Sequence, residues 1–234
     1  MSAPAITTQG AAPDAGRLIP LTGMRGAIAR NMSQGWQIPR VAHSVEVDVS
    51  RCEALRASLG GAGRKPSLTV LLLRAVALTL REHPGLNALM REKAVELMPE
   101  VNLGVAVSLD DGLMVPVIRN ADTLPLEALG AELRRLAEGS RAGTLSAGNY
   151  QRGTFTVSNL GMTAIDRFSP IINPPQVAIL GVTRVIERPV VRDGAIVAAP
   201  MMGLHLIFDH RAVDGYPAAL FLGELARRIE TADL

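Results

Sequence analysis

Two stretches of this chain predict pairs of β-strands joined by tight turns, and this pairing limits the possible folds more than any other feature. VNLGVAVSL continues through Asp110-Asp111-Gly112 into LMVPVI, and VIERPVV continues through Arg192-Asp193-Gly194 into AIVAA. An Asp-Gly step between two apolar runs is a strong hairpin signal. Helical patterns lie between the two pairs, so hairpins and crossovers must share one sheet. The sequence therefore predicts an α/β or α+β domain with a mixed sheet rather than a doubly wound parallel sheet.

Further strands and the helices are predicted from apolar spacing and capping residues. Additional strands are expected at 43–50, 153–161, 176–182 and 203–208, and helices at 22–36, 50–59, 68–83, 125–138 and 217–231. Ser50 and Glu53 have the spacing of a capping box, and Ser67 is a second expected N-cap. The apolar run at 68–80 contains Arg74 and is too short to cross a bilayer, which favours a buried helix.

Composition places the chain among globular proteins of one large domain. The 234 residues are 48% hydrophobic and 20% charged, which is enough to bury a substantial core. Residues 1–16 are rich in small residues and proline and lack periodicity, so we expect a flexible leader or linker there and a folded domain over 17–234.

Charge and cysteine content narrow the partners and the compartment. The formal net charge is +2, aromatic residues make up 3%, and no run of five like charges occurs, so we expect no nucleic-acid partner. The single cysteine, Cys52, cannot form an internal disulfide, and the first residues lack the pattern of a signal peptide. These features predict a cytoplasmic protein without a membrane partner.

His210 is the candidate general base among the four histidines. It lies where the last predicted strand becomes a turn, whereas His43, His83 and His205 lie in elements that favour a structural role. A neutral imidazole can remove a proton near neutral pH. Asp214, four residues later, is expected to keep the surroundings rigid by orienting a neighbour or by pairing with Arg211 or a distant arginine. The alternative is that Asp214 only caps the closing helix and His210 is a turn residue.

Ser158 and Asn159 end the predicted strand GTFTVSN and bring hydroxyl and amide donors to its edge. Acyl transfer passes through a tetrahedral oxyanion, and one preplaced donor is worth about 3 kcal/mol of barrier. Ser158 is not expected to be a nucleophile because the G-x-S-x-G elbow is absent from the sequence. Cys52, in a short amphipathic helix, suits packing. Direct transfer, in which His210 activates the acceptor, is therefore the simpler scheme.

The sequence offers little for metal or nucleotide cofactors. It contains neither the H-E-x-x-H zinc pattern nor the G-x-G-x-x-G dinucleotide loop, and the glycines at 60–66 do not fit a phosphate loop. His205, Asp209 and His210 are close in sequence, but His205 and His210 are an odd number of strand positions apart and are expected to point in opposite directions. We therefore expect no metal site.

Four motifs together resemble one family. They are PLTGMRGAIARNMS at 20–33, GTFTVSNLGM at 153–162, SPIINPPQVAILGV at 169–182 and DHRAVDG at 209–215. In this order they resemble the catalytic domain of the dihydrolipoamide acyltransferase component of 2-oxo acid dehydrogenase complexes, over about residues 17–234. The resemblance implies a fold like that of chloramphenicol acetyltransferase, with a mixed sheet flanked by helices, assembled as a homotrimer. It also implies a channel between subunits, which coenzyme A and lipoamide enter from opposite ends.

The resemblance also implies roles for single residues. His210 corresponds to the base that takes a proton from a thiol so that the sulfur can attack an acyl thioester. Asp214 corresponds to the acid that holds the site by pairing, and Ser158 to the hydroxyl that binds the oxyanion. Arg17 and Ser33 fall at positions similar to coenzyme A contacts. The run SNLGMTAIDRFSPIINPPQ at 158–176 resembles that of acetyl-transferring or acetoin-type members, so acetyl is the expected acyl group.

Partners follow from the same resemblance. Members of the family join into cubic or dodecahedral cores and work with a lipoyl domain, a decarboxylase and dihydrolipoamide dehydrogenase. Neither a lipoyl domain nor a peripheral-subunit-binding domain is present in this sequence. Glu92-Lys93-Ala94 has only a superficial likeness to a lipoyl site, so the lipoyl group is expected from another domain or chain. Two other functions remain open, namely a stand-alone acetyltransferase of the chloramphenicol type and a non-catalytic assembly scaffold.

Overall fold

The computed structural model describes residues 18, 20–60, 65–109 and 112–234. The helices are α1 (Gly23–Trp36), α2 (Ser50–Leu59), α3 (Leu68–Glu82), α4 (Leu126–Ala142) and α5 (Gly215–Thr231), with one 3-10 turn at Ala147–Tyr150. The strands are β1 (Arg40–Asp48), β2 (Ala88–Met90), β3 (Val95–Leu97), β4 (Leu103–Val105), β5 (Val107–Leu109), β6 (Gly112–Met114), β7 (Val117–Ile118), β8 (Phe155–Asn159), β9 (Ala178–Arg192) and β10 (Ala195–Asp209). The leader or linker predicted at 1–16 lies outside the described residues.

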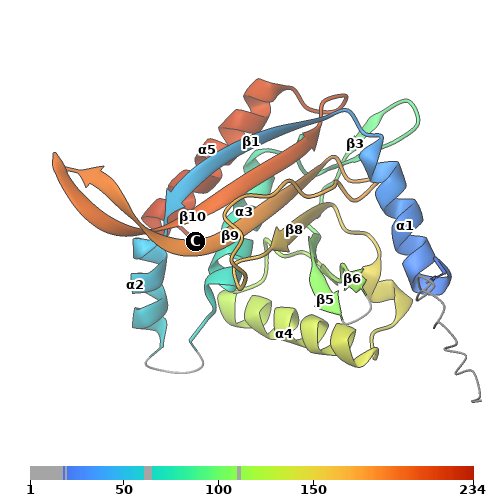
Figure 1. Cartoon of the computed structure of the whole chain (residues 1–234), viewed down its shortest axis with the longest axis horizontal. Helices are drawn as coiled ribbons and strands as arrows, with labels where there is room; N and C mark the ends of the chain where they lie inside the picture. The colour runs from blue at the N-terminus through green and yellow to red at the C-terminus, as the bar shows by residue number, and fades with distance from the viewer. Residues whose placement is uncertain (1–17, 19, 61–64, 110–111) are drawn as a thin grey trace, which may run out of the picture.

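The main sheet is mixed, as the sequence predicts. Its six strands follow the order β1-β10-β9-β8-β4-β7. β8 runs parallel to both β4 and β9, and the remaining neighbours are antiparallel. Helices α2 and α3 lie between β1 and the following strands in the chain, whereas β9 and β10 form one hairpin (Figure 1). Crossovers and hairpins thus share one sheet.

The predicted hairpin turn at 192–194 is present in the structure. Asp193 and Gly194 have φ values of 51° and 80°, and Arg192 pairs with Ala195 across the turn. Two consecutive residues with positive φ are typical of a two-residue turn whose twist matches that of the strands. The other predicted turn includes 110–111, which lie outside the described residues, but its flanking strands β5 and β6 are paired.

Strand lengths differ from the prediction. The segments expected as four strands at 176–182, 185–191, 195–199 and 203–208 form two continuous strands of 15 residues, β9 and β10. Polar residues do not break β9, because Thr183 Oγ1 accepts a hydrogen bond from the Gly203 backbone N–H at 2.9 Å and Arg184 pairs with Asp166 at 2.6 Å. Beyond the sheet the two strands form an arm, which projects at the left of Figure 1.

Helix ends are partly as predicted. The Ser67 side chain caps α3 by accepting a hydrogen bond from Val70 N–H at 3.3 Å. The capping box at α2 is wrong. The N-cap is Val49, the Ser50 hydroxyl donates to Asp48 at 2.6 Å, and Glu53 pairs with Arg56. Both side chains predicted to form the capping box are therefore bonded to neighbouring side chains instead, Ser50 to Asp48 and Glu53 to Arg56.

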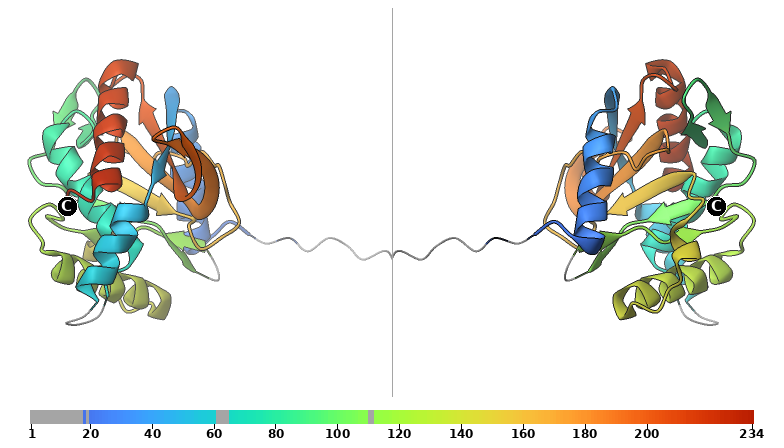
Figure 2. Two further views of the ribbon diagram at one scale, coloured as in Figure 1. Left: turned by 90° about the vertical axis from the view of Figure 1, so that its left-hand side faces the viewer. Right: turned by 90° about the vertical axis from the view of Figure 1, so that its right-hand side faces the viewer.

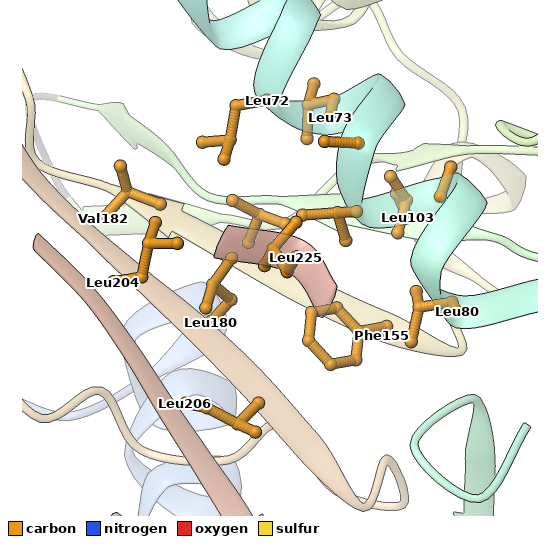
Figure 3. Packing of buried hydrophobic residues seen from close by; sticks show 14 of the residues in the cluster. Leu72, Leu73, Leu80, Leu103, Phe155, Leu180, Val182, Leu204, Leu206 and Leu225 are labelled. Carbon is orange, nitrogen blue, oxygen red and sulfur yellow. The ribbon is translucent and has the colours of Figure 1, made fainter. Parts of the chain in front are cut away.

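The sheet has one face covered by helices and one covered mainly by irregular chain. Leu180, Leu204 and Leu206 are fully buried on the helix-covered face, where Figure 3 shows them near Leu72 and Leu73 of α3 and Leu225 of α5. The opposite face carries a small cluster of Ile172, Ile179 and Ile207, in which Ile172 comes from the irregular segment after β8, and α1 packs against that segment at Gly35. Figure 2 shows α1 and α5 on opposite sides of the sheet. We call these the helix face and the open face.

The apolar segment predicted as a buried helix is α3, most of whose side chains are buried. Among the described residues, no helix combines the length and apolar character required to cross a membrane.

Candidate active site

His210 follows directly after β10 and precedes α5. Its backbone N–H donates a hydrogen bond to the Pro39 carbonyl at 2.8 Å, which holds the turn against the start of β1. Its side chain is 46% exposed, and its ring lies 6.0 Å from that of Phe208. A half-exposed imidazole on an anchored backbone is accessible to a substrate and keeps a defined position.

An ion pair between buried Asp209 and half-exposed Arg211 supports this turn. The Asp209 carboxylate has no exposed surface and accepts hydrogen bonds from the Arg211 backbone N–H and Nε, both at 3.0 Å, and from Arg211 Nη2 at 2.7 Å. This bonding raises the pKa of the Arg211 guanidinium. Arg211, one of the partners considered for Asp214, is thus paired with Asp209 instead. The sequence contained a signal for this ion pair, because Asp209 and Arg211 have opposite charges and lie directly before and after His210.

Asp214 lies at the N-cap position of α5, but its side chain makes no capping hydrogen bond. Its carboxylate is 85% exposed, and Oδ1 lies 3.9 Å from His210 Nδ1. This distance exceeds hydrogen-bond reach and allows only an ion pair with a protonated ring. Within the described residues Asp214 has no arginine partner. The alternative that Asp214 only caps α5 is therefore supported by its N-cap position, but the capping hydrogen bond is not formed.

Ser158 and Asn159, adjacent at the end of β8, point to opposite faces of the sheet. Asn159 donates to Thr69 Oγ1 on α3 at 3.1 Å and accepts from the Gly161 N–H at 2.7 Å, so both ends of its amide are used within the chain. Ser158 is half-buried and pairs in register with Gly181. The amide donor that the sequence suggested is therefore engaged, and the Ser158 hydroxyl is the remaining candidate.

Ser158 and His210 lie at opposite ends of the sheet. Ser158 aligns with Gly181, which aligns with His205, and His210 is five residues further along the chain. Since β9 and β10 are antiparallel, the carboxyl end of β10 lies beside the amino end of β8, and Figure 1 shows their arrowheads pointing in opposite directions. With strand spacings near 4.8 Å and a rise near 3.3 Å per residue, the two Cα atoms are about 19 Å apart. One chain does not bring these two side chains together.

Ser33 is exposed on α1, and Arg17 lies outside the described residues. α1 is held to the open-face segment where Asn31 Nδ2 donates to Asn173 Oδ1 at 2.7 Å. The structure therefore gives Ser33 a stable, accessible position.

The remaining histidines and the cysteine have protein neighbours. His43 packs edge-on against Phe208, and His83 against Phe221. Burial raises the pKa of Cys52 to about 11, and its Sγ lies 3.1 Å from the Ile229 carbonyl. A buried thiol of this kind is a poor nucleophile. Across the described ranges, no three His, Cys, Asp or Glu side chains gather as a metal site would require.

The fold defines the class of protein first. A chloramphenicol acetyltransferase structure superposes with a TM-score of 0.53 at 14% sequence identity, covering 86% of this chain and 94% of that chain. At such identity the likeness concerns the fold alone. It confirms the predicted mixed sheet flanked by helices and places the chain in the chloramphenicol acetyltransferase-like class.

The family is more specific. The family described as 2-oxoacid dehydrogenases acyltransferase (catalytic domain) matches residues 13–234, and the chain belongs to it. The lipoamide acyltransferase component of the branched-chain α-keto acid dehydrogenase complex of Pseudomonas aeruginosa is 41% identical over 211 residues, covering 87% of this chain and 49% of the relative. The dihydrolipoyllysine-residue acetyltransferase component of the acetoin cleaving system of Bacillus subtilis is 36% identical over 218 residues, covering 91% and 55%. The chain thus spans about half the length of these relatives.

Solved structures agree with this assignment. The dihydrolipoamide acetyltransferase of Azotobacter vinelandii, in a structure concerned with the role of one serine, one histidine and one asparagine in its catalytic mechanism, has a TM-score of 0.88 at 35% identity and covers 93% of each chain. The cubic core of a pyruvate dehydrogenase multienzyme complex has the same TM-score at 36% identity and covers 93% of each chain. The resemblance stated from the four motifs is confirmed.

Proposed function

We propose that this domain transfers an acyl group, acetyl in the first instance, between dihydrolipoamide and coenzyme A. The observation that carries the proposal is the half-exposed His210 ring on its anchored turn, in a chain of this family. In the Azotobacter vinelandii relative the histidine and asparagine of interest are four residues apart, as are His210 and Asp214 here. An acid in place of an amide gives this chain a group that can stabilise a protonated His210.

The proposed reaction needs one proton to move twice. His210 removes the proton from the coenzyme A thiol, which is mostly protonated at neutral pH, and the resulting thiolate attacks the carbonyl carbon of S-acyl-dihydrolipoamide. Ser158 donates a hydrogen bond to the tetrahedral oxyanion. The intermediate then expels the dihydrolipoamide sulfur, which takes the proton back from His210. Acyl-coenzyme A and dihydrolipoamide are the products, and no covalent enzyme intermediate forms.

We further propose that each site is built from two chains. The separation of about 19 Å between Ser158 and His210 within one chain is far beyond hydrogen-bond reach, so a shared site requires the serine of one subunit and the histidine of the next. A closed homotrimer with head-to-tail contacts supplies three such sites. The similarity to a cubic core supports trimers as building blocks of a larger cubic or dodecahedral core.

The remaining assignments belong to the same proposal. Arg17 and Ser33 contact coenzyme A, and the lipoyl group arrives on another domain or chain. The decarboxylase and dihydrolipoamide dehydrogenase components are the functional partners, in the cytoplasm. We choose acetyl over a branched acyl group because the run at 158–176 resembles that of acetyl-transferring or acetoin-type members and one relative is an acetoin-system acetyltransferase, although a relative of higher identity belongs to a branched-chain complex.

Subunit complementation tests the two-chain site. His210→Ala and Ser158→Ala variants are each expected to be nearly inactive with acetyl-coenzyme A and dihydrolipoamide. When the two are unfolded together and reassembled in equal amounts, about one quarter of the wild-type activity should return, since random assembly joins an intact serine to an intact histidine at one site in four. Each variant reassembled alone is the control. Inactivity of the mixture would contradict a shared site.

Substrate assays test the reaction itself. Wild-type protein should transfer an acetyl group to dihydrolipoamide faster than it transfers an isobutyryl group. It should not acetylate chloramphenicol. A preference for chloramphenicol would favour a stand-alone acetyltransferase, and a correctly assembled but inactive wild-type protein would favour a scaffold.

A further inference from the structure

A cavity of about 610 Å³ lies on the open face, away from His210. Its walls come from β1, from the segment that follows β8, and from β10, where Gly203 forms an irregularity in the pairing with β9. A Cβ atom at Gly203 would lie 2.8 Å from Thr183 Oγ1 and 3.1 Å from His205 Nε2, so only glycine leaves this wall unstrained. Such irregularities often adjoin functional sites.

His205 is the buried polar group of this cavity. It is 8% exposed, its Nδ1 lies 2.7 Å from Ser44 Oγ, and the Phe168 ring packs against it with centroids 6.2 Å apart. Its Nε2 is buried and has no hydrogen-bond partner among the described residues. An unsatisfied buried donor or acceptor costs about 1–3 kcal/mol, which a ligand that bonded it would recover.

The protonation state of the His205 ring and its bond to Ser44 decide whether Nε2 is a donor or an acceptor. Burial lowers the pKa of His205, and the Asp166 backbone carbonyl opposes part of that shift. The ring is therefore neutral near pH 7, with one proton to place. In the tautomer in which the Ser44 hydroxyl donates its hydrogen bond to Nδ1, the single ring proton is on Nε2. The cavity then offers a donor that needs an acceptor.

Charge in the cavity favours an anionic acceptor. Glu46 pairs with Arg188 at 3.3 Å, and Asp166 pairs with Arg184 at 2.6 Å, so each acid of the wall has an arginine partner. Arg167 is exposed at the rim and forms no ion pair within the described residues. Its charge is close enough to disfavour protonation of His205. One positive charge thus remains beside a buried N–H.

We propose that this cavity, the His205 cavity, binds a carboxylate group, with His205 Nε2 and the Arg167 guanidinium as its donors. The carboxylate comes either from a free small acid or from the far end of an acyl group. Ser158, Gly181 and His205 form one row across three strands, so the Cα atoms of Ser158 and His205 are about 10 Å apart. Phe168 lies over Gly181, between them. Only the acyl source rests on the proposed function.

Histidine NMR tests the cavity without requiring activity. In protein labelled with ¹³C-histidine, added succinate should shift the His205 ring signal saturably, whereas chloride at equal ionic strength should not. His83, at the end of α3, is the internal control. Arg167→Gln should weaken succinate binding about tenfold, the effect of losing about 1.4 kcal/mol. Arg135→Gln, on the exposed side of α4, is the matched control and should change nothing.

Acyl donors distinguish the two sources. If the carboxylate belongs to an acyl group, succinyl-coenzyme A should be a substrate, and His205→Asn should lower its kcat/KM about tenfold relative to that of acetyl-coenzyme A. Asparagine can keep the bond to Ser44 but loses the Nε2 donor, whereas His205→Gln places a donor near it and should restore selectivity. Saturable succinate binding with unchanged acyl selectivity assigns the site to a free acid. Absence of both effects overturns the His205 cavity, whereas inactivity with every acyl donor counts against the proposed function and leaves the NMR result to decide.

Discussion

The two faces of the main sheet use the same strands in different ways. On the helix face, Leu180, Leu204 and Leu206 are fully buried among apolar side chains. On the open face, the positions between them carry Gly181 and His205, in one row with Ser158 and Ser44. The helix face supplies stability, and the open face supplies polar groups with unused bonding capacity. Substitutions of neighbouring residues in one strand are therefore expected to have different effects, on the free energy of unfolding at the helix face and on activity or binding at the open face.

The largest effect is expected at the end of β10, where neither face is involved. His210→Ala should lower kcat about 1000-fold, or about 4 kcal/mol of activation free energy, because a general base is lost. The side chain is half-exposed, so the free energy of unfolding should change by less than about 0.5 kcal/mol. Steady-state kinetics and urea unfolding measure the two quantities. A fall in stability that matched the fall in activity would make His210 a structural residue.

The helix face should respond with stability instead. Leu206→Ala removes a fully buried side chain and should lower the free energy of unfolding by about 3 kcal/mol. The folded fraction should retain its kcat. Val191→Ala, at an exposed position in the hairpin arm, is the control and should cost less than about 0.5 kcal/mol. An equal loss for both variants would mean that the helix face is not the source of stability.

Two adjacent residues of β8 sharpen the same contrast. Ser158→Ala should lower kcat about 100-fold, equivalent to about 2.7 kcal/mol, through loss of the oxyanion donor, with little change in unfolding. Asn159→Ala should instead lower stability by about 1–2 kcal/mol, because the bonds to Thr69 and Gly161 disappear. Kinetics and unfolding of both variants decide the matter, and exchanged effects would assign the oxyanion donor to Asn159.

Weakening the Asp209–Arg211 ion pair, which supports the turn that carries His210, should have a smaller effect on kcat. Arg211→Lys keeps the charge near buried Asp209 but loses the two-point contact, so the turn that holds His210 should loosen. We expect kcat to fall about tenfold, near 1.4 kcal/mol, with KM unchanged. His210→Ala combined with Arg211→Lys is the control, because without the imidazole the lysine should have no further effect on kcat.

Sequence reasoning reached the five helices, the fold class and the family, but it missed the short strands β2 and β3 and the distances within the site. The Ser67 cap and the Asp193-Gly194 turn are local features, so their residue types suffice to predict them. Ser158 and His210 were each correctly placed at the end of a strand. That these ends are opposite depends on the pairing of β8 with β9 and of β9 with β10, which joins residues far apart in sequence. The Asp209–Arg211 pair was missed because the carboxylate was considered only as a metal ligand.

The smallest expected effect is a difference in pH dependence on the open face. Burial lowers the pKa of His205 in the folded protein, and in the unfolded chain it is near 6.5. As the pH falls through about 6.5, the unfolded chain gains a proton that the folded protein does not take up, so stability declines until the lower folded pKa is reached. His205→Asn removes this contribution, whereas Glu46, Asp166 and Arg167 around the cavity remain. Urea midpoints at about pH 7.5 and pH 5.5 should therefore fall less in the variant than in the wild type. Equal falls would mean that His205 is protonated as readily in the folded protein as in the unfolded chain. The assignment of a neutral His205 ring as the donor in the His205 cavity would then be wrong.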